Sequence, residues 1–246
     1  MSTLKNKVAL VTGAARGIGA VIASKFADAG YQVVINYANG KDAAAALVAE
    51  ITKKGGAAVA LQADVSKPDQ VKKLFDDSIA HFGKIDVLVN NAGLMITKPV
   101  KDCTDEDFTR QFDINVRGTF NTLREAATRL ADHGSIINFS STNIRVLVPT
   151  YSIYSATKAA VEQFTRIFSK EIGARGINVN AVAPGPVNTE LFTKGKPPEV
   201  IARFASMTAF NRIGEPEDIS GVVLFLAGDE AKWINGQSIG INGAMA

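Results

Sequence analysis

Tyr154 and Lys158 are four residues apart, and Ser141 precedes Tyr154 by thirteen. If Tyr154 lies in the first turns of a helix, this spacing puts the phenol and the ammonium on one face, within reach of one bound molecule. A phenol with a pKa of about 10 is too weak an acid or base for work near neutrality. A positive charge at roughly 4 Å and an effective dielectric near 20 is worth about 4 kcal/mol, or about three pKa units. We therefore expect Lys158 to bring the Tyr154 pKa toward that of a useful general acid.

A glycine-rich turn near the start of the chain adds a cofactor to this chemistry. Gly13, Gly17 and Gly19 lie where the first predicted strand meets the first predicted helix. Without side chains, the backbone can turn sharply and approach a pyrophosphate at a helix N-terminus. The spacing is G-x-x-x-G-x-G rather than the usual G-x-G-x-x-G, so the position between strand and helix carries the inference. The combination predicts redox chemistry on a carbonyl with a bound dinucleotide.

The end of the second predicted strand indicates which dinucleotide binds. Folds of this kind place an Asp or Glu about twenty residues after the glycine turn, where it holds the ribose 2′-hydroxyl of NAD. This chain has Asn36 there. With no carboxylate to repel a 2′-phosphate, and with Arg16 able to meet it, we predict that NADP(H) is preferred over NAD(H). The alternative is that Arg16 is an ordinary solvated charge.

Two further turns follow predicted strands and are candidate adenosine contacts. Asp64 and Val65, after the third strand, can accept a hydrogen bond from the adenine amino group. Asn90 to Gly93, after the fourth strand, offers polar backbone beside the adenosine ribose, so Asn91, Ala92 and Gly93 are predicted cofactor contacts. Either segment could instead be an ordinary turn.

Short apolar runs alternate with longer segments of helical period. The near-continuously apolar runs, typical of parallel strands covered on both faces, are 8–11, 32–36, 57–62, 87–90, 135–140, 178–182 and 238–241. The helical segments between them are 17–29, 41–54, 68–82, 105–130, 152–174 and 216–227. This alternation predicts a single-domain α/β fold over residues 1–246, with a Rossmann-like doubly wound parallel sheet of about seven strands and helices on both faces.

Residues 185–211 break the alternation, because Pro186, Gly195, Pro197 and Pro198 interrupt any strand pattern. A long connection after the carboxyl end of a strand is where such folds build a cover over the substrate. We expect 185–211 to form a substrate lid; a passive surface loop is the alternative.

Composition excludes several other classes of protein. The chain has 46% hydrophobic and 21% charged residues, a mean hydropathy of +0.09 and a net charge of +3. Its basic residues are scattered, so no nucleic-acid partner is expected. Residues 1–11 are too short for the apolar core of a secretory signal, and no run approaches the roughly 18 apolar residues of a membrane span. We expect no membrane partner and a cytoplasmic location.

Cysteine and histidine usage fits this expectation. Cys103 is the single cysteine and cannot form an internal disulfide, as in a reducing compartment. Neither His81 nor His133 is near it in sequence, so we interpret it as inert. Two histidines without ligand-like spacing predict no catalytic metal.

With these residues identified, the chain resembles the classical short-chain dehydrogenase/reductase family, from about Lys7 to Gly243. Several separated motifs in the right order are far more specific than any one of them. The matching segments are the turn 12–19, Asn90-Asn91-Ala92-Gly93, Asn115, Ser141, Tyr154 with Lys158, and Pro184-Gly185 with Thr189. Residues 236–237 and 242–243 resemble the closing strand, although Ala244 stands where a second glycine is common; we expect this departure to leave the chemistry untouched.

The resemblance implies a role for each residue. Tyr154 would give a proton to the carbonyl oxygen as hydride arrives, and take it back in oxidation, while Ser141 would donate a hydrogen bond to that oxygen. Lys158 would hold the nicotinamide ribose, and Asn115 would position a water that carries protons through Lys158. Residues 184–187 would line the nicotinamide. The cofactor contacts so implied are Gly13, Arg16, Gly17, Ile18, Gly19, Tyr154, Lys158, Pro184, Gly185, Val187 and Thr189, with Val187 and Thr189 bonding the carboxamide.

The predicted substrate pocket is largely apolar. It combines 94–96, 142–151 and the lid; Ile144, Val146, Leu147 and Val148 form its wall, interrupted by Asn143 and Arg145. Such a pocket favours a moderately hydrophobic ketone or aldehyde over a small charged acid. The predicted activity is reversible, NADPH-dependent reduction of that carbonyl to an alcohol.

Alternatives remain open. One is reduction of a 3-oxoacyl group on acyl carrier protein, which needs a basic docking face. Arg124 and Arg129 are candidates, or they pair with Glu125 and Asp132. A catalytically silent NADP-sensing protein is a further alternative, against which the complete Ser141, Tyr154 and Lys158 set argues. The resemblance also implies a homotetramer built through the central helix pair and the last strand.

Overall fold

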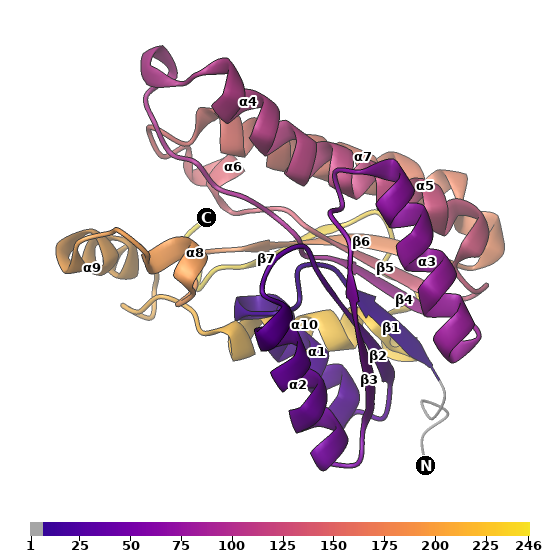
Figure 1. Cartoon of the computed structure of the whole chain (residues 1–246). Coiled ribbons are helices and arrows are strands. Elements are labelled where there is room, and N and C mark those ends of the chain that lie inside the picture. The colour runs from indigo at the N-terminus through magenta and orange to yellow at the C-terminus, as the bar shows by residue number, and fades with distance from the viewer. Residues whose placement is uncertain (1–6) are drawn as a thin grey trace.

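The computed structural model describes residues 7–246, so the expectation about a leader segment lies partly outside the described residues. Within that range, seven strands form one parallel sheet in the order β3-β2-β1-β4-β5-β6-β7 (Figure 1). This order confirms the predicted Rossmann-like, doubly wound, single-domain fold. The strands are β1 (Val8–Val11), β2 (Gln32–Tyr37), β3 (Ala57–Gln62), β4 (Val87–Asn90), β5 (Ser135–Phe139), β6 (Asn178–Pro184) and β7 (Ser238–Ile241).

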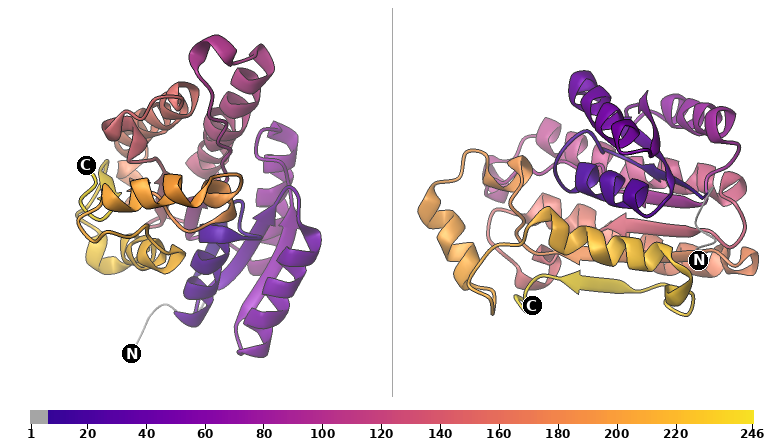
Figure 2. Two further views of the ribbon diagram at one scale, coloured as in Figure 1. Left: turned by 90° about the vertical axis from the view of Figure 1, so that its left-hand side faces the viewer. Right: turned by 90° about the horizontal axis from the view of Figure 1, so that it is seen from below.

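Helices cover both faces of the sheet. Figure 1 shows α1, α2 and α10 on one face and α3, α5 and α7 on the other, and Figure 2 shows α10 beside α1 from below. The helices are α1 (Gly17–Asp28), α2 (Lys41–Lys53), α3 (Pro68–Phe82), α4 (Asp105–Phe112), α5 (Gly118–Arg129), α6 (Asn143–Val146), α7 (Ser152–Glu171), α8 (Glu190–Thr193), α9 (Pro198–Ser206) and α10 (Pro216–Ala227).

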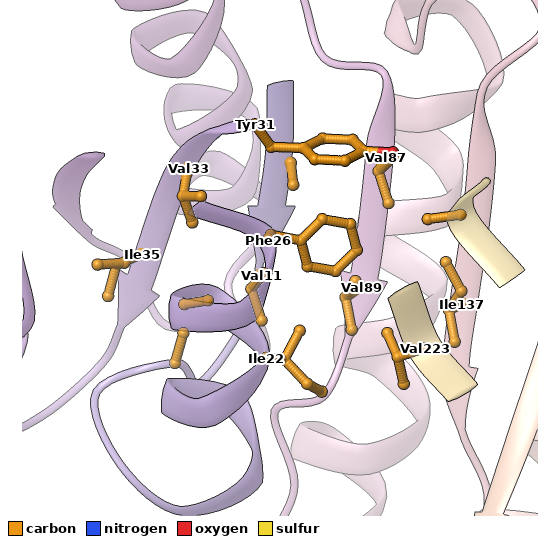
Figure 3. Packing of buried hydrophobic residues seen from close by; sticks show 14 of the residues in the cluster. Val11, Ile22, Phe26, Tyr31, Val33, Ile35, Val87, Val89, Ile137 and Val223 are labelled. Atoms are coloured by element: carbon orange, nitrogen blue, oxygen red, sulfur yellow. The ribbon is translucent and has the colours of Figure 1, made fainter. Parts of the chain in front are cut away.

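Apolar side chains fill the space between these layers. On the α1 and α10 face, Phe26 meets Tyr31 edge to face, with ring centroids 4.8 Å apart, above the valines of β1 and β4 (Figure 3). A second cluster on the opposite face includes Leu74 and Phe75 of α3 and Leu123 of α5. Central strands therefore bury both faces, which explains their continuous apolar sequence. The two clusters hold the strand ends, and hence the loops after them, in fixed positions.

The central helix predicted over 105–130 is interrupted. It begins at a capping box in which the Thr104 hydroxyl accepts from the Asp107 amide and the Asp107 carboxylate accepts from the Thr104 amide. It then passes through a π-helical turn, Asp113–Arg117, before α5. Such wide turns are frequent at functional sites. Here the turn contains Asn115, whose side chain is fully bonded to neighbouring segments.

The segment 185–211 is more ordered than its prolines indicate, because it contains α8 and α9. Pro198 occupies the first turn of α9, where a missing amide proton costs nothing. The rings of Phe192 and Phe204 meet edge to face at 5.2 Å and join the two short helices. Both helices lie beyond the carboxyl ends of the strands (Figure 1). A lid function for this segment stays a prediction.

Candidate active site

A cleft of about 870 Å³, open to solvent, lies where several strands end. In an open parallel sheet the loops diverge where the strand order reverses, here between β1 and β4, and ligands bind in that crevice. Ser141, Tyr154 and Lys158 all line this cleft, together with Asn91, Gly93 and Pro184. The structure therefore brings together residues that the sequence separates by nearly a hundred positions.

Strand β5 and helix α7 position the three central side chains. Because β5 ends at Phe139, Ser141 lies just beyond the strand, while Tyr154 and Lys158 occupy the first two turns of α7. The Lys158 ammonium donates a 2.7 Å hydrogen bond to the Phe139 carbonyl and lies 5.7 Å from the centre of the Tyr154 ring. The Ser141 hydroxyl accepts from the Asn143 amide at 3.2 Å and lines the cleft together with the Tyr154 side chain.

The expected lowering of the Tyr154 pKa is wrong for this structure. Burial raises the pKa of Tyr154 to about 12, because a phenolate in the cleft wall loses its hydration; only the hydrogen bond with Ser141 acts in the opposite direction. Burial also lowers the pKa of Lys158 to about 8. Desolvation therefore outweighs the attraction between the two groups. The phenol holds its proton firmly at neutral pH, as a proton donor must.

Asn115 is locked by three hydrogen bonds. Its amide donates to the Leu94 carbonyl at 2.8 Å and to the Thr157 hydroxyl at 3.0 Å, and its oxygen accepts from the Leu94 amide at 2.8 Å. It is 1% exposed and joins the π-helical turn to α7 and to the loop after β4. Since the side chain is fully used, any water placed at this position would have to be held by other atoms. Thr157, which completes the network, was not singled out from the sequence.

The glycine turn forms a close-fitting cradle. Gly13 has a φ of +61°, and a Cβ added there would lie 2.9 Å from the Ala92 backbone. A Cβ on Gly19 would lie 2.5 Å from the side-chain nitrogen of Asn91 and 2.7 Å from the Gly13 carbonyl oxygen. Asn91 donates to the carbonyls of both Thr12 and Gly13. The turn suits a dinucleotide, because Gly13, Gly17 and Gly19 leave its backbone without side chains at the amino end of α1.

The Asn36 side chain is used inside the protein and does not face a bound dinucleotide. It is 1% exposed; its oxygen accepts from the Gly13 amide at 3.3 Å, and its amide donates to the carbonyls of Leu61 and Ala63. Its side chain thus ties the glycine turn to β3, and β2 continues through Tyr37. The first exposed residues after β2 are 38–40, in Ala-Asn-Gly, which also contain no carboxylate. The premise of the NADP(H) prediction survives at these neighbouring positions.

Arg16 is engaged with the segment after β6. Its guanidinium is 80% exposed and lies 2.9 Å from the Glu190 carboxylate at the start of α8, which also pairs with Lys194 at 2.9 Å. The pKa of Glu190 is lowered by its hydrogen bond to Lys194 and by the two neighbouring positive charges. An exposed pair of this kind holds weakly, so Arg16 can exchange partners.

The other predicted adenosine contacts have local structural partners. One Asp64 oxygen accepts from the Ser66 amide at 2.9 Å, which leaves the second oxygen for a ligand. Val65 is buried, and its carbonyl accepts from the Asn121 amide group at 2.9 Å. Gly93 lies where an added Cβ would be 3.6 Å from the Lys158 nitrogen. A methyl group there would touch the ammonium at ordinary van der Waals distance.

The loop after β6 forms another side of the cleft. Pro184, Gly185, Val187 and Thr189 all line it, as does Ile18 of α1. Thr189 precedes α8 directly and approaches the glycine turn, because a Cβ on Gly17 would lie 3.6 Å from its methyl group. These residues of the loop and of α1 therefore face one shared space, as their predicted cofactor roles require.

The apolar wall of the cleft differs in part from prediction. Leu94, Met95, Asn143 and Val146 line it, together with Tyr151 at the end of 142–151. Further lining comes from Leu191, Phe192, Phe204 and Met245, which sequence patterns did not single out individually.

The remaining predicted wall residues point elsewhere. Leu147 is 74% exposed in a left-handed turn. Arg145 pairs with the buried Glu162 at 3.3 Å. The Ile96 amide donates to the Gln111 oxygen at 2.9 Å, and Ile144 and Val148 are also not part of the cleft lining. Within the short helix α6, Asn143 and Val146 are three residues apart and share the side that faces the cleft, whereas Ile144 and Arg145 lie on other sides of the helix.

Metal and membrane sites are not found in the described chain. Residues 7–246 hold no cluster of three or more metal-ligating side chains. Over the same residues, every helix is too short or too polar to cross a bilayer. Cys103 is half-buried, with its sulfur 3.4 Å from the Pro99 carbonyl, away from the cleft lining.

Known proteins share both the sequence and the fold. A family model described as "Enoyl-(Acyl carrier protein) reductase" matches residues 13–245. Elsinochrome reductase 1 of Elsinoe fawcettii is 45% identical over 255 residues, which cover 99% of this chain and 96% of that protein. The chain belongs to the short-chain dehydrogenase/reductase family.

Other members extend the comparison. Versicolorin reductase of Emericella nidulans is 42% identical over 252 residues, covering 98% of this chain and 96% of that protein. The solved structure of the angucycline C-6 ketoreductase LanV with bound NADP superposes with a TM-score of 0.94 at 38% identity, covering 99% of this chain and 97% of that one. The short-chain dehydrogenase/reductase fold therefore extends over the whole described length of this chain.

Proposed function

We propose that this protein reduces a hydrophobic ketone or aldehyde to an alcohol with NADPH, and catalyses the reverse oxidation. The observation that carries the proposal is that Tyr154, Ser141 and the Lys158 ammonium line one cleft with largely apolar walls, with the ammonium 5.7 Å from the centre of the Tyr154 ring. A protonated phenol, a hydroxyl donor and a cation in one cleft suit a reaction in which an oxygen gains negative charge.

The proton donors of this site fit carbonyl reduction. When bound, the dinucleotide supplies a hydride to the carbonyl carbon. The Ser141 and Tyr154 hydroxyls would donate hydrogen bonds to the carbonyl oxygen, and the Tyr154 proton would pass to that oxygen as the carbon–oxygen double bond becomes single. An alkoxide is a far stronger base than a phenolate, so a phenol with a pKa of about 12 still transfers its proton downhill.

Lys158 would then stabilise the resulting phenolate. Its ammonium is close to the Tyr154 ring and is buried, so a transient negative charge on the phenol oxygen is attracted in a medium of low dielectric. Asn115 contributes by fixing Thr157 and the loop at Leu94, and thereby the first turns of α7. In the oxidative direction, the same phenolate would take the alcohol proton.

NADP(H) is the proposed cofactor, on two grounds. The exposed segment after β2 has no carboxylate to repel a 2′-phosphate, and Arg16 projects from the glycine turn with only an exposed ion pair holding it. The ketoreductase LanV was solved with NADP and shares the fold throughout. Cofactor contacts are proposed for the turn 13–19, for 64–65, for 91–93 and for the loop 184–189.

The carrier-protein alternative has less support. Arg129 is occupied by Asp76 and Glu125, at 3.0 Å from the latter, and it packs over Phe75. Arg124 lies over the ring of Phe120. Arg129 is therefore already paired, and Arg124 alone makes a small basic face for an acidic partner. The reductases named for elsinochrome and versicolorin favour a small hydrophobic carbonyl compound as the substrate.

Purified protein and a substrate panel test the proposal. NADPH oxidation is followed with 2-tetralone, cyclohexanone, a sugar aldehyde and a 3-oxoacyl thioester, with NADH in parallel. We expect the best turnover with NADPH and hydrophobic ketones. Activity confined to thioesters would favour the carrier-protein alternative, and NADPH binding without turnover of any carbonyl would favour the silent NADP-sensing alternative.

A homotetramer is part of the proposal. Apolar side chains are exposed on the helices of one face, with Phe108 at 49%, Phe120 at 45% and Ile167 at 55%, and β7 is the edge strand of the sheet. Trp233, fully exposed, lies in the segment leading to β7. Burial of these surfaces between subunits would remove a large apolar area from water. Light scattering should give about four times the mass of 26.0 kDa.

A further inference from the structure

Residues 242–246 fold back toward the cleft and place Met245 in its wall. In Figure 1 the yellow end of the chain lies between α6 and α8, the two short helices whose side chains also line the cleft. Met245 belongs to none of the motifs that identify the catalytic or cofactor residues. Its side chain is half-buried and carries no charge, so its contribution must be through shape and apolar contact.

Asn242 holds this segment in place. Its amide donates to the Thr142 hydroxyl at 3.1 Å and to the Ala246 carbonyl at 3.1 Å, while its oxygen accepts from the Met245 amide at 3.3 Å. Thr142 is itself buried and follows Ser141 directly. One side chain therefore joins residues 242–246 to the strand end that presents the candidate catalytic serine.

A left-handed turn directs Met245 inward. Gly243 and Ala244 have φ values of +61° and +58°, which reverse the chain within two residues. The Gly243 carbonyl accepts from the Ala209 amide at 2.8 Å, which fixes the turn against the segment after α9. This backbone region is unfavourable for a residue with a side chain, so the surrounding contacts must impose the conformation on Ala244. Ala244 thus determines where the next side chain lies.

The rest of the apolar wall indicates what Met245 would contact. Leu191, Phe192 and Phe204 come from α8 and α9, and Met95 comes from the loop after β4. Thioethers and aromatic rings pack favourably against aromatic faces, and methionine adapts its shape to them. Two methionines and two phenylalanines in one neutral wall suit a flat ring system.

We propose that Met245 is a specificity-determining residue, which selects neutral ketones that carry fused or aromatic rings over compact ketones. The proposal rests on the carbonyl reductase function above, and it assigns the recognition of the ring system to residues 242–246. Met245 has no part in hydride or proton transfer. Changing its bulk therefore alters which ketone is used and leaves the cofactor affinity as it was.

Kinetics with two ketones test this assignment. Met245→Phe should lower kcat/KM for the bicyclic 2-tetralone at least tenfold and change that for cyclohexanone by less than about threefold, because excess bulk in a pocket is worth about 1–3 kcal/mol. Met207→Phe is the matched control, since Met207 is 38% exposed outside the cleft lining. An equal change for both ketones, or the same ratio shift in the control, contradicts the proposal.

The tether at Asn242 supplies a second kinetic test. In an Asn242→Ala background the segment can swing away, so Met245→Phe should lose most of its effect on the ratio of the two kcat/KM values. An undiminished effect would show that Asn242 does not position Met245.

Binding can be read without turnover. The chain has four methionines, so ¹³C-methyl labelling gives a simple NMR spectrum. With NADP⁺ present, 2-naphthol should shift the methyl signals of Met95 and Met245 and leave that of Met207 unchanged. A shift of Met95 without Met245 would overturn the assignment. Failure of the wild type to turn over any ketone would instead contradict the proposed function, and the methyl signals would still decide the role of Met245.

Discussion

The Lys158 ammonium lies 5.7 Å from the centre of the Tyr154 ring but directs its hydrogen bond to the Phe139 carbonyl, at 2.7 Å. Proximity of opposite charges is therefore not the dominant influence on the phenol. Burial dominates. It raises the pKa of Tyr154 and lowers the pKa of Lys158, and so favours the uncharged form of both side chains. The attraction between Lys158 and Tyr154 becomes strong only when the phenol loses its proton.

Stability should rise with pH because of Lys158. Its pKa is about 8 in the folded protein and about 10.5 in an unfolded chain, so between these values the unfolded chain binds the extra proton and unfolding becomes less favourable as pH increases. From about pH 8 to about pH 9.5, the free energy of unfolding should gain about 1–2 kcal/mol more in the wild type than in Lys158→Met. Urea titrations at the two pH values measure this difference.

The comparison with Lys158→Met isolates the contribution of Lys158 to the pH dependence of the free energy of unfolding. The pKa values of Lys196 and Lys232 are also lowered by burial, in both proteins alike. Tyr154 acts at higher pH, because its raised pKa of about 12 favours the folded state below about pH 10 and this advantage is lost as pH rises toward 12. Equal slopes in the wild type and the variant would show that Lys158 is not desolvated.

Gly19→Ala should damage the dinucleotide cradle. The new methyl group would lie 2.5 Å from the side-chain nitrogen of Asn91 and 2.7 Å from the Gly13 carbonyl oxygen, so the glycine turn must shift. We expect NADPH affinity to fall at least tenfold and stability by about 1–3 kcal/mol, measured by calorimetry and by urea unfolding. The control is Gly221→Ala in α10, where nothing lies within 4 Å of the added carbon, and which should be neutral or slightly stabilising. Equal effects in both variants would contradict the cradle.

Asn115→Ala should destabilise the protein through unpaired backbone groups. It leaves both the amide and the carbonyl of Leu94 without their partner in a part-buried position. The expected loss is about 2–3 kcal/mol in urea unfolding, set by the cost of unsatisfied polar groups. Asn39→Ala, at an exposed position, should lose less than about 0.5 kcal/mol. A similar small loss at Asn115 would mean that its network is unimportant.

Arg16 and Glu190 should tune cofactor choice in opposite directions. Arg16→Ala should weaken NADPH binding about tenfold or more and leave NADH within about twofold, because only NADPH carries the 2′-phosphate. Glu190→Gln should tighten NADPH binding a few-fold, because Arg16 no longer has to leave a carboxylate 2.9 Å away. Fluorescence titrations with both cofactors measure these constants. Parallel changes for NADPH and NADH would rule out a phosphate contact.

The sheet and the central residues were predictable from local patterns. Continuous apolar runs identify strands buried on both faces, and the spacing of Tyr154 and Lys158 needs only a helix to bring them together. Asn36 shows where such inference stops. Its partners Leu61 and Ala63 belong to β3 and the turn after it, and nothing in the sequence states how β2 and β3 are aligned or that the side chain is used for this contact.

Features that depend on several distant segments were also missed. The π-helical turn at Asn115 depends on bonds to Leu94 and Thr157, so helical period alone predicts one continuous helix. The pKa of Tyr154 depends on a balance between burial and charge that spacing cannot give. Met245 reaches the cleft only because Ala244 adopts a left-handed conformation, which its residue type disfavours.

The most direct test of this account is single-turnover reduction of 2-tetralone by Tyr154→Phe, with NADPH affinity measured in parallel. The variant loses only a hydroxyl, so cofactor binding should stay within about threefold, whereas the rate of the chemical step should fall by a factor of about 10² to 10⁴ because the proton donor is gone. Ser141→Ala, which removes a supporting donor, should cost less. Full chemical rate in Tyr154→Phe, with normal NADPH binding, would contradict the assignment of Tyr154 as the acid.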